Sequence, residues 1–314
     1  EVHIILKDGT KNYLYSGRNR AGLEKEGLST GLLLLTCEAG YNEWLNNPNA
    51  GHNDSSNYNA SLCATSGCGH IDARSGNAWT SKGSANTYYG GAGIGTKGYS
   101  NGGSNIEGQM AGSNALDNLT IAGGNILALG GRGQGADDSS GGGANIGTGS
   151  ASTSSVISGT VTRFKITGGN FDLLRGDNSA ACIGGGYRSG YVNMEIYGGT
   201  ISTSDNIDEN RGSSTPTDYK STLSNTGRAR AACIGGGGGG TSSASPAGAT
   251  VKIYGGRISA TNRYGAAIGA GAGGSTGSAT AAKVYISGGH ITAETTIGDG
   301  KGAGAGIGTG GSLG

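Results

Sequence analysis

A ten-residue pattern that occurs five times constrains this chain more than any other feature of its sequence. Each copy has apolar residues at its first, third and eighth positions, glycines at the fifth and sixth, and a short or apolar side chain at the tenth. The copies span residues 119–128, 164–173, 194–203, 251–260 and 284–293. A second element, Ile-Gly, alternates with them at Ile94, Ile146, Ile183, Ile234, Ile268 and Ile307. Two motifs that recur in turn are the signature of a repeat protein.

The repeat predicts three short strands in each coil of the chain. Alternation of apolar and polar residues is typical of a strand with one buried face, and paired glycines permit a sharp corner between two strands. The Ile-Gly element supplies a third inward-facing segment. Equivalent residues of successive coils would then stack about 4.8 Å apart. We therefore expect an all-β fold, a single-stranded parallel β-helix (β-solenoid) of right-handed form, with long loops inserted between the motifs.

The motifs divide the chain into three stretches. Residues 1–36 are expected to form the first coils of the β-helix, and residues 91–314 its regular coils. Residues 37–90 break the rhythm and hold both Trp residues and three of the five Cys, so we expect a loop-rich insertion there. Within it, residues 69–73 resemble the tail of a decapeptide that has lost its first strand.

Composition excludes several classes of protein. Gly makes up 69 of 314 residues, but without the strict three-residue period of collagen. The net charge is +1, so we expect no binding to nucleic acid. The apolar run at residues 32–35 is too short to span a bilayer, which predicts no membrane insertion. The chain does not begin with Met, and we expect a processed piece or part of a longer protein.

The five cysteines cannot all pair with one another. Cys182 and Cys233 precede consecutive Ile-Gly elements, so they should stack on adjacent coils as a thiol ladder or a disulfide. Cys63 and Cys68 can close a small loop by a disulfide, which leaves Cys37 over. Histidines lie in the same stretch, but their spacing matches no standard zinc pattern. We expect no metal and no cofactor.

Acidic residues give little support for catalysis. Cleavage of a polysaccharide by hydrolysis needs two carboxylates on one face. Asp172 and Glu195 occupy outward positions in successive coils and are the candidate pair for two neighbouring carboxylates, but isolated outward acids are the favoured interpretation. The other acidic groups, at residues 137–138 and 205–209, fall in insertions. We expect no enzymatic activity and assign no catalytic residue.

Aromatic residues of the 37–90 stretch are candidates for contact with sugar rings, and the alternative is that they pack this loop onto the solenoid. They are Trp44, Trp79, Tyr88 and Tyr89. Three triplets have the form of N-glycosylation acceptors, at Asn53, Asn59 and Asn118. The chain is rich enough in Asn, Ser and Thr for such triplets to arise by chance.

The alternation of the decapeptide with Gly-Ala-Gly-Ile-Gly resembles glycine-rich repeats of large cell-surface and secreted proteins. Many of these belong to Gram-positive bacteria and are described as adhesin-like or carbohydrate-binding. The resemblance covers residues 90–314 and, weakly, residues 12–24. It implies a parallel β-helix on an extracellular or cell-surface protein, and it supplies no catalytic residues to transfer.

These observations favour a non-enzymatic structural β-solenoid. Its expected role is a surface stalk, an adhesin or a filament or sheath subunit. An exposed end of a β-helix is an unpaired sheet edge, which proteins normally cover, so we expect flanking domains or end-to-end self-association. The alternative is a carbohydrate-binding module that uses the aromatic residues of the 37–90 loop, and a weaker alternative is a polysaccharide lyase or hydrolase.

Overall fold

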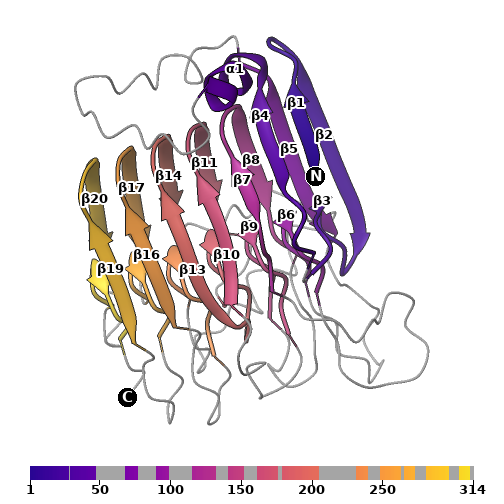
Figure 1. Ribbon diagram of the computed structural model, residues 1–314. Coiled ribbons are helices and arrows are strands. Elements are labelled where there is room, and N and C mark those ends of the chain that lie inside the picture. The colour runs from indigo at the N-terminus through magenta and orange to yellow at the C-terminus, as the bar shows by residue number, and fades with distance from the viewer. Residues whose placement is uncertain are drawn as a thin grey trace.

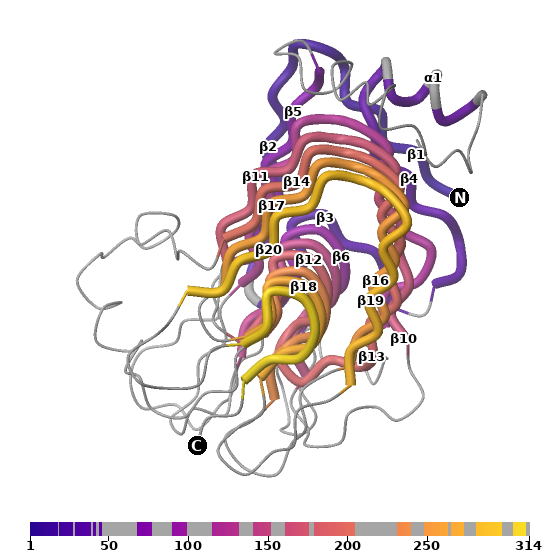
Figure 2. The backbone as a smooth tube through the Cα atoms, turned by 90° about the vertical axis from the view of Figure 1, so that its left-hand side faces the viewer, coloured from indigo at the N-terminus to yellow at the C-terminus, as the bar shows by residue number. Residues whose placement is uncertain are grey.

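The chain folds into the expected parallel β-solenoid. The computed structural model describes residues 1–27, 29–46, 68–76, 90–98, 115–131, 141–151, 161–175, 179–204, 231–239, 248–262, 265–272, 281–296 and 304–311. Within these residues the strands form three parallel sheets of seven strands each. Successive coils run from the N-terminal end of the solenoid to its C-terminal end (Figure 1) and nest one behind another when viewed along the stack (Figure 2).

Each coil contributes one strand to each sheet. The first sheet contains β1 (Val2–Leu6), β4 (Leu33–Cys37), β7 (Leu119–Ile121), β10 (Val161–Ile166), β13 (Tyr191–Ile196), β16 (Ala249–Ile253) and β19 (Ala282–Ile286). The second contains β2 (Lys11–Arg18), β5 (His70–Gly76), β8 (Asn125–Leu129), β11 (Asn170–Leu174), β14 (Thr200–Ser204), β17 (Arg257–Asn262) and β20 (His290–Thr295). The third contains β3 (Leu23–Glu24), β6 (Ile94–Gly95), β9 (Ile146–Gly147), β12 (Ile183–Gly184), β15 (Ile234–Gly235), β18 (Ile268–Gly269) and β21 (Ile307–Gly308).

Glycines permit both the corners and the close stacking of coils. The decapeptide forms a strand of the first sheet, a glycine corner and a strand of the second sheet. At the corner after β13, Gly199 has φ of +99°, a conformation that favours glycine. In the third sheet, a Cβ on Gly184 would overlap the carbonyl oxygen of Gly235 in the next coil. Ile-Gly repeats because only glycine lets these backbones approach so closely.

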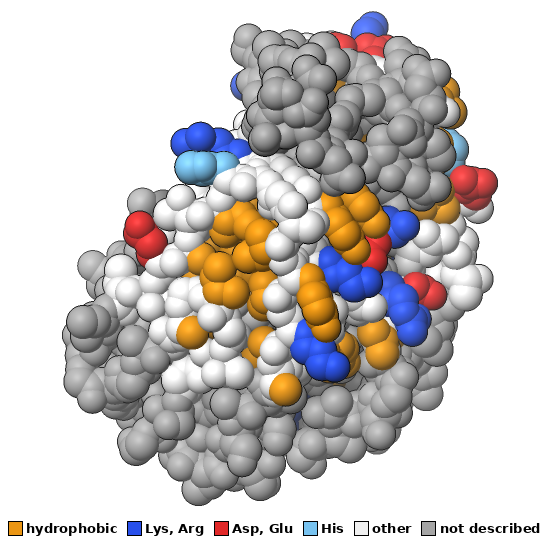
Figure 3. Space-filling model, turned by 60° about the vertical axis from the view of Figure 1, so that its left-hand side comes forward, with side chains coloured by type: hydrophobic (Ala, Val, Ile, Leu, Met, Phe, Trp, Pro, Cys, Tyr) orange, Lys and Arg blue, Asp and Glu red, His pale blue; other side chains and the backbone are white. Residues whose placement is uncertain are grey.

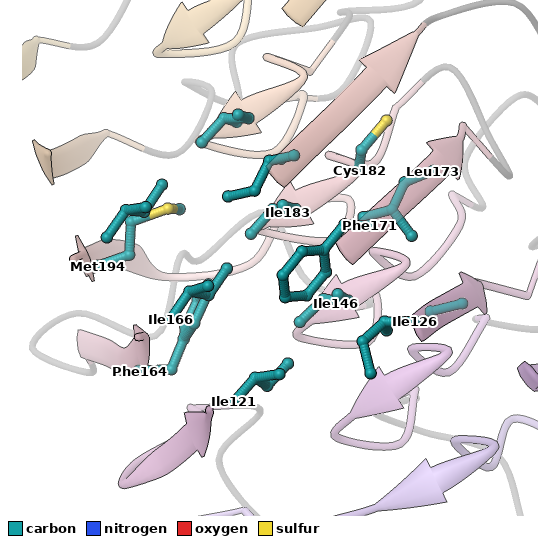
Figure 4. Packing of buried hydrophobic residues seen from close by; sticks show 14 of the residues in the cluster. Ile121, Ile126, Ile146, Phe164, Ile166, Phe171, Leu173, Cys182, Ile183 and Met194 are labelled. Carbon is teal, nitrogen blue, oxygen red and sulfur yellow. The ribbon is translucent and has the colours of Figure 1, made fainter. Parts of the chain in front are cut away.

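The core is made of ladders of identical or similar side chains. Ile166, Ile196 and Ile253 are register partners on neighbouring strands and are at most 1% exposed. Figure 4 shows how side chains from the three sheets converge on one interior, with Phe164 and Phe171 among the isoleucines. Burial of large apolar side chains at every coil is the main favourable term in folding.

An insertion splits one decapeptide at its corner. β4 and β5 pair with β7 and β8 in the register of a complete decapeptide, with Leu35 opposite Ile121 and Ile71 opposite Ile126. The segment at 69–73 has therefore not lost its first strand, which is β4. The residues between the two halves begin with the helix α1 (Glu38–Asn46), which packs against β4 and β1.

Candidate functional site

The C-terminal end of the solenoid exposes its core ladders. Ile286 and Ile307 are 47% and 44% exposed, although their register partners Ile253 and Ile268 are 1% and 0% exposed. The three strands at this end, β19, β20 and β21, each lie at the edge of their sheet, and no other described strand covers them. The space-filling view shows hydrophobic side chains gathered over this side of the molecule (Figure 3). We call this surface the C-terminal end face.

The N-terminal end carries the same ladders. Val2 is 57% exposed, whereas its partner Leu33 is 7% exposed, and Ile4 and Leu23 are only partly buried. β1, β2 and β3 are the opposite edges of the three sheets among the described strands. We call this surface the N-terminal end face. The sequence led us to expect that flanking domains or another copy would cover such edges, and among the described residues neither edge is covered.

A groove of about 470 Å³ lies on the outer face of the first sheet, beside β10 and β13. It is lined by Thr30, Asp117, Asn118, Leu119, Arg163, Phe164, Lys165, Asn193 and Glu195. Its charged side chains come from outward positions of the decapeptides and from the residues that precede them. Sequence reasoning did not identify this groove, because it depends on how different coils line up.

Glu195 is held in a charge network on this face. Its carboxylate oxygens lie 3.1 Å from Lys252 Nζ and 4.0 Å from Lys165 Nζ, and the Tyr197 hydroxyl donates to it at 2.9 Å. Burial opposes ionisation, but the bonds from Lys252 and Tyr197 and the two lysine charges outweigh it and lower the pKa of Glu195. Burial and the adjacent Glu195 raise the pKa of Tyr197 to about 12. The Tyr197 ring stacks on Tyr254 at a centroid distance of 4.6 Å.

The candidate carboxylate pair of Asp172 and Glu195 does not form. Asp172 lies on β11 of the second sheet and pairs with Ser202, whereas Glu195 lies on β13 of the first sheet between Lys165 and Lys252. The two outward positions are on opposite sides of the glycine corner. A carboxylate with a lowered pKa between two lysines is also poorly suited to donate a proton.

Only one of the four candidate aromatic residues lies in the described residues. Trp44 is on α1, where its ring stacks on Tyr41 and meets the His3 ring edge-on at 5.3 Å. This arrangement packs α1 onto β1, in line with the alternative that the aromatic residues attach the loop to the solenoid. Trp79, Tyr88 and Tyr89 lie outside the described residues.

Of the three N-glycosylation triplets, only the one at Asn118 lies in the described residues. Asn53 and Asn59 lie outside the described residues. Asn118 is exposed, has φ of +55° and donates its side-chain amide to the Thr30 carbonyl at 3.0 Å. Its side chain lines the groove, so a glycan on Asn118 would stand at the groove's edge.

Cys182 and Cys233 stack on adjacent coils, as their positions before Ile183 and Ile234 predict. The Cys233 thiol donates to the Thr261 carbonyl at 3.0 Å, and Arg175 Nη2 approaches its sulfur at 3.4 Å. The hydrogen bond with Cys233 and burial raise the pKa of the Cys182 thiol well above its ordinary value. The geometry suits the thiol-ladder interpretation. The fully buried Arg175 escaped sequence reasoning, since its side chain reaches a coil 58 residues further on.

The second expected cysteine pair, Cys63 and Cys68, differs from what the structure shows. Cys63 lies outside the described residues. The thiol of Cys68 contacts that of Cys37, the cysteine to which the sequence analysis assigned no partner. The Cys37 and Cys68 sulfurs are 2.8 Å apart. Asp8 brings a carboxylate to within 4.8 Å of both sulfurs, so these three groups are also candidate metal ligands. His70 is not in this group, and burial lowers its pKa.

Comparisons of the chain with protein-family models, with curated proteins and with solved structures found no match. In the part of the chain that the structure describes, no helix combines the length and the hydrophobicity needed to cross a membrane.

Proposed function

We propose that this chain is a non-enzymatic, extracellular structural β-solenoid, such as a surface stalk, adhesin or filament subunit, whose coils stack head to tail on a second copy. The observation that carries the proposal is that the two end faces expose the same ladders in the same register. When the register is followed across the seven strands of the first sheet, Val2 and Val284 occupy the same position, and so do Ile4 and Ile286. In the third sheet Leu23 and Ile307 occupy the same position. A second copy placed one coil spacing beyond the C-terminal end face would continue all three sheets.

The side chains that would meet are complementary. Val284 and Ile286 would cover Val2 and Ile4, and Ile307 would cover Leu23, which removes exposed apolar surface at both ends. Glu1 precedes Val2, and Lys283 precedes Val284. In the stacked arrangement Glu1 of one copy would lie beside Lys283 of the other, so that opposite charges face each other across the junction. Backbone hydrogen bonds along three strand edges would add to these contacts.

A mixing experiment tests both the contact and its direction. Ile307→Lys places a charge on the C-terminal end face, and Val2→Lys places one on the N-terminal end face. We expect the unmodified chain to form rods that lengthen with concentration, as seen by electron microscopy and light scattering. Each variant alone should remain monomeric, and a mixture of the two should form only 1:1 dimers, because each contributes one intact end.

Ser287→Lys is the matched control, since Ser287 is exposed on the same terminal coil but lies outside the ladders. It should assemble like the unmodified chain. An unmodified chain that stays monomeric at every concentration would contradict the proposal. Dimers formed by the Ile307→Lys variant alone would show that its N-terminal end faces meet each other, and this would contradict the head-to-tail direction.

Carbohydrate binding is the second candidate function, and the groove on the first sheet supports it. Polar and charged side chains line this groove, and one of them, Glu195, accepts a hydrogen bond from Tyr197, whose ring stacks on Tyr254. A glycan array probed with the unmodified chain and with Arg163→Ala tests this role. Binding that Arg163→Ala abolishes, while Arg257→Ala on the second sheet retains it, would support the groove as the site. The absence of any bound glycan would remove this candidate.

A further inference from the structure

The insertion after β4 leaves and re-enters the solenoid through one corner position. In the neighbouring coil this corner is Gly123-Gly124, between Ile121 and Asn125. Leu35 is opposite Ile121, which places Cys37 at the position of Gly123. His70 is opposite Asn125, which places Cys68 at the same position on the returning chain. The two cysteines therefore mark the two ends of the insertion where a regular coil has a single residue.

The folded structure holds both sulfurs in place. Cys37 is 0% exposed and Cys68 is 4% exposed, and both belong to the hydrophobic core. Cys37 is fixed by its pairing with Leu6 in the first sheet. Cys68 is fixed by the side-chain amide of Asn125, which donates to its carbonyl at 3.1 Å. With both backbones held, the sulfurs meet at 2.8 Å.

This spacing favours a covalent bond between the sulfurs over a shared metal ion. Two thiolates on one tetrahedral zinc, each about 2.3 Å from the metal, would be about 3.8 Å apart. The sulfurs are closer than this, and also closer than the roughly 3.5–4.0 Å at which even non-bonded carbon atoms make contact. Asp8, the third candidate ligand, is exposed and its backbone N–H is bonded to the Glu38 carboxylate.

We propose that Cys37 and Cys68 form a disulfide that closes the neck of the insertion. The bond forms by exchange with a small-molecule disulfide such as oxidised glutathione. One cysteine thiolate attacks that disulfide and releases one glutathione thiolate, and the second cysteine thiolate then attacks the mixed disulfide and releases the other. Two cysteine thiols and one external disulfide become one protein disulfide and two glutathione thiols. Because both sulfurs are buried in the folded chain, exchange takes place before this corner closes.

The bond would anchor the insertion to the solenoid. Cys37 directly precedes α1, so a closed neck fixes the start of the helix that carries Tyr41 and Trp44 onto His3. The disulfide would also join β4 to β5 by a short covalent link, as the glycine corner joins the corresponding strands in the other coils. This inference stands independently of head-to-tail stacking, because it concerns a corner and neither end face.

Peptide mapping tests the bond directly. Trypsin leaves Cys37, Cys63 and Cys68 in one peptide, since the sequence has no Lys or Arg between Lys25 and Arg74. A second cut before Asp54 separates Cys37 from the other two. The full-length Cys63→Ser variant is refolded in a glutathione redox buffer, alkylated in denaturant and digested with both proteases. We expect residues 26–53 and 54–71 to remain joined until dithiothreitol is added, with a mass two hydrogens below the sum of the thiol peptides.

Three results would overturn the proposal. The first is separate peptides that carry the alkyl label on both Cys37 and Cys68. The second is an unmodified chain in which Cys37 is labelled while Cys63 and Cys68 are joined within residues 54–71. The third is one equivalent of zinc retained by the Cys63→Ser variant and lost when Cys37 is changed to Ser.

A melting experiment gives an independent measure. Reduction should lower the melting temperature of the unmodified chain by several degrees. Cys37→Ser and Cys68→Ser should melt at the lower temperature without reductant and no longer respond to it. Cys182→Ser is the control and should keep the full response to reductant. If Cys37→Ser does not fold, the mapping of Cys63→Ser still decides the question.

Discussion

Ile253 and Ile286 are register partners in the first sheet, yet the first is 1% exposed and the second 47% exposed. The two side chains occupy the same ladder position and differ only in that Ile286 has no described coil beyond it. Comparing these two residues therefore shows how much of a core isoleucine's contribution to the unfolding free energy depends on its being buried by the next coil. The difference also indicates how much free energy would be gained if a second copy covered the C-terminal end face.

Truncation of these two side chains should therefore have unequal effects. Ile253→Ala removes buried methyl groups and leaves a cavity, and we expect a loss of about 2–5 kcal/mol in unfolding free energy. Ile286→Ala should cost less than about 1 kcal/mol at concentrations where the chain is monomeric. Denaturant titration of the two variants checks this. Equal losses would mean that the terminal coil is covered in solution.

The glycine ladder of the third sheet should be among the least tolerant sites in the chain. Gly184 has φ of +137°, and its Cβ would overlap the Gly235 carbonyl oxygen. Gly184→Ala should cost about 3 kcal/mol or more, from backbone strain and a steric clash together.

Two other glycines separate these causes. Gly9 has φ of +73° but nothing within 4 Å of a Cβ, and Gly17 has neither a positive φ nor a nearby atom. Gly9→Ala should cost about 1–2 kcal/mol, and Gly17→Ala should change stability by less than about 0.5 kcal/mol. Thermal or denaturant unfolding of the three variants gives the order, and a fully folded, equally stable Gly184→Ala would refute the close approach of the coils.

The ladders explain why the fold can be predicted from sequence. In a parallel solenoid, equivalent residues of each coil share one environment, so the pattern at Ile166 is repeated at Ile196 and Ile253. Five copies of one signal are far stronger evidence than one strand pattern. The 37–90 stretch has no second copy, and α1 within it could not be predicted, because a nine-residue helix leaves little periodic signal.

Predictions about pairs of residues depended on placing each residue on the correct sheet. Asp172 is the ninth residue of its decapeptide and Glu195 the second, so both face outward but from different sheets. Cys63 and Cys68 are close in sequence, whereas the structure brings Cys68 to Cys37 through the register of β4 and β5. Such contacts follow from strand register, which the local sequence around each residue does not reveal.

Acidification should weaken the charge network on the first sheet. Because the pKa of Glu195 is lowered in the folded chain, its ionised form stabilises the fold above the ordinary carboxyl pKa of about 4.3. This contribution is lost as pH falls below that value and through the lowered pKa. Glu195→Gln should therefore reduce the melting temperature at pH 7 and flatten its dependence on pH between about 5 and 2. Glu294→Gln, at an exposed position of β20, should keep the dependence of the unmodified chain.

Asn145 tests whether a buried polar bridge outweighs the ladder pattern. It precedes Ile146, at the position where later coils have Cys182, Cys233 and Ala267. Its side chain is 0% exposed, accepts the Gly130 N–H at 3.0 Å and donates to the Leu174 carbonyl at 2.6 Å.

Asn145→Ala makes this coil resemble the others, yet it deprives the Gly130 N–H and the Leu174 carbonyl of these bonds. We expect a loss of about 1–3 kcal/mol, because a buried polar group without its partner retains its full desolvation penalty. Cys182→Ala, at the same ladder position one coil further on, should cost less. A thiol is a weak donor, and the hydrogen bond of Cys182 to the Ser204 carbonyl is long, at 3.6 Å. Denaturant unfolding of both variants checks the order. If Cys182→Ala proves the more destabilising, packing of the side chain at this position outweighs its hydrogen bonds.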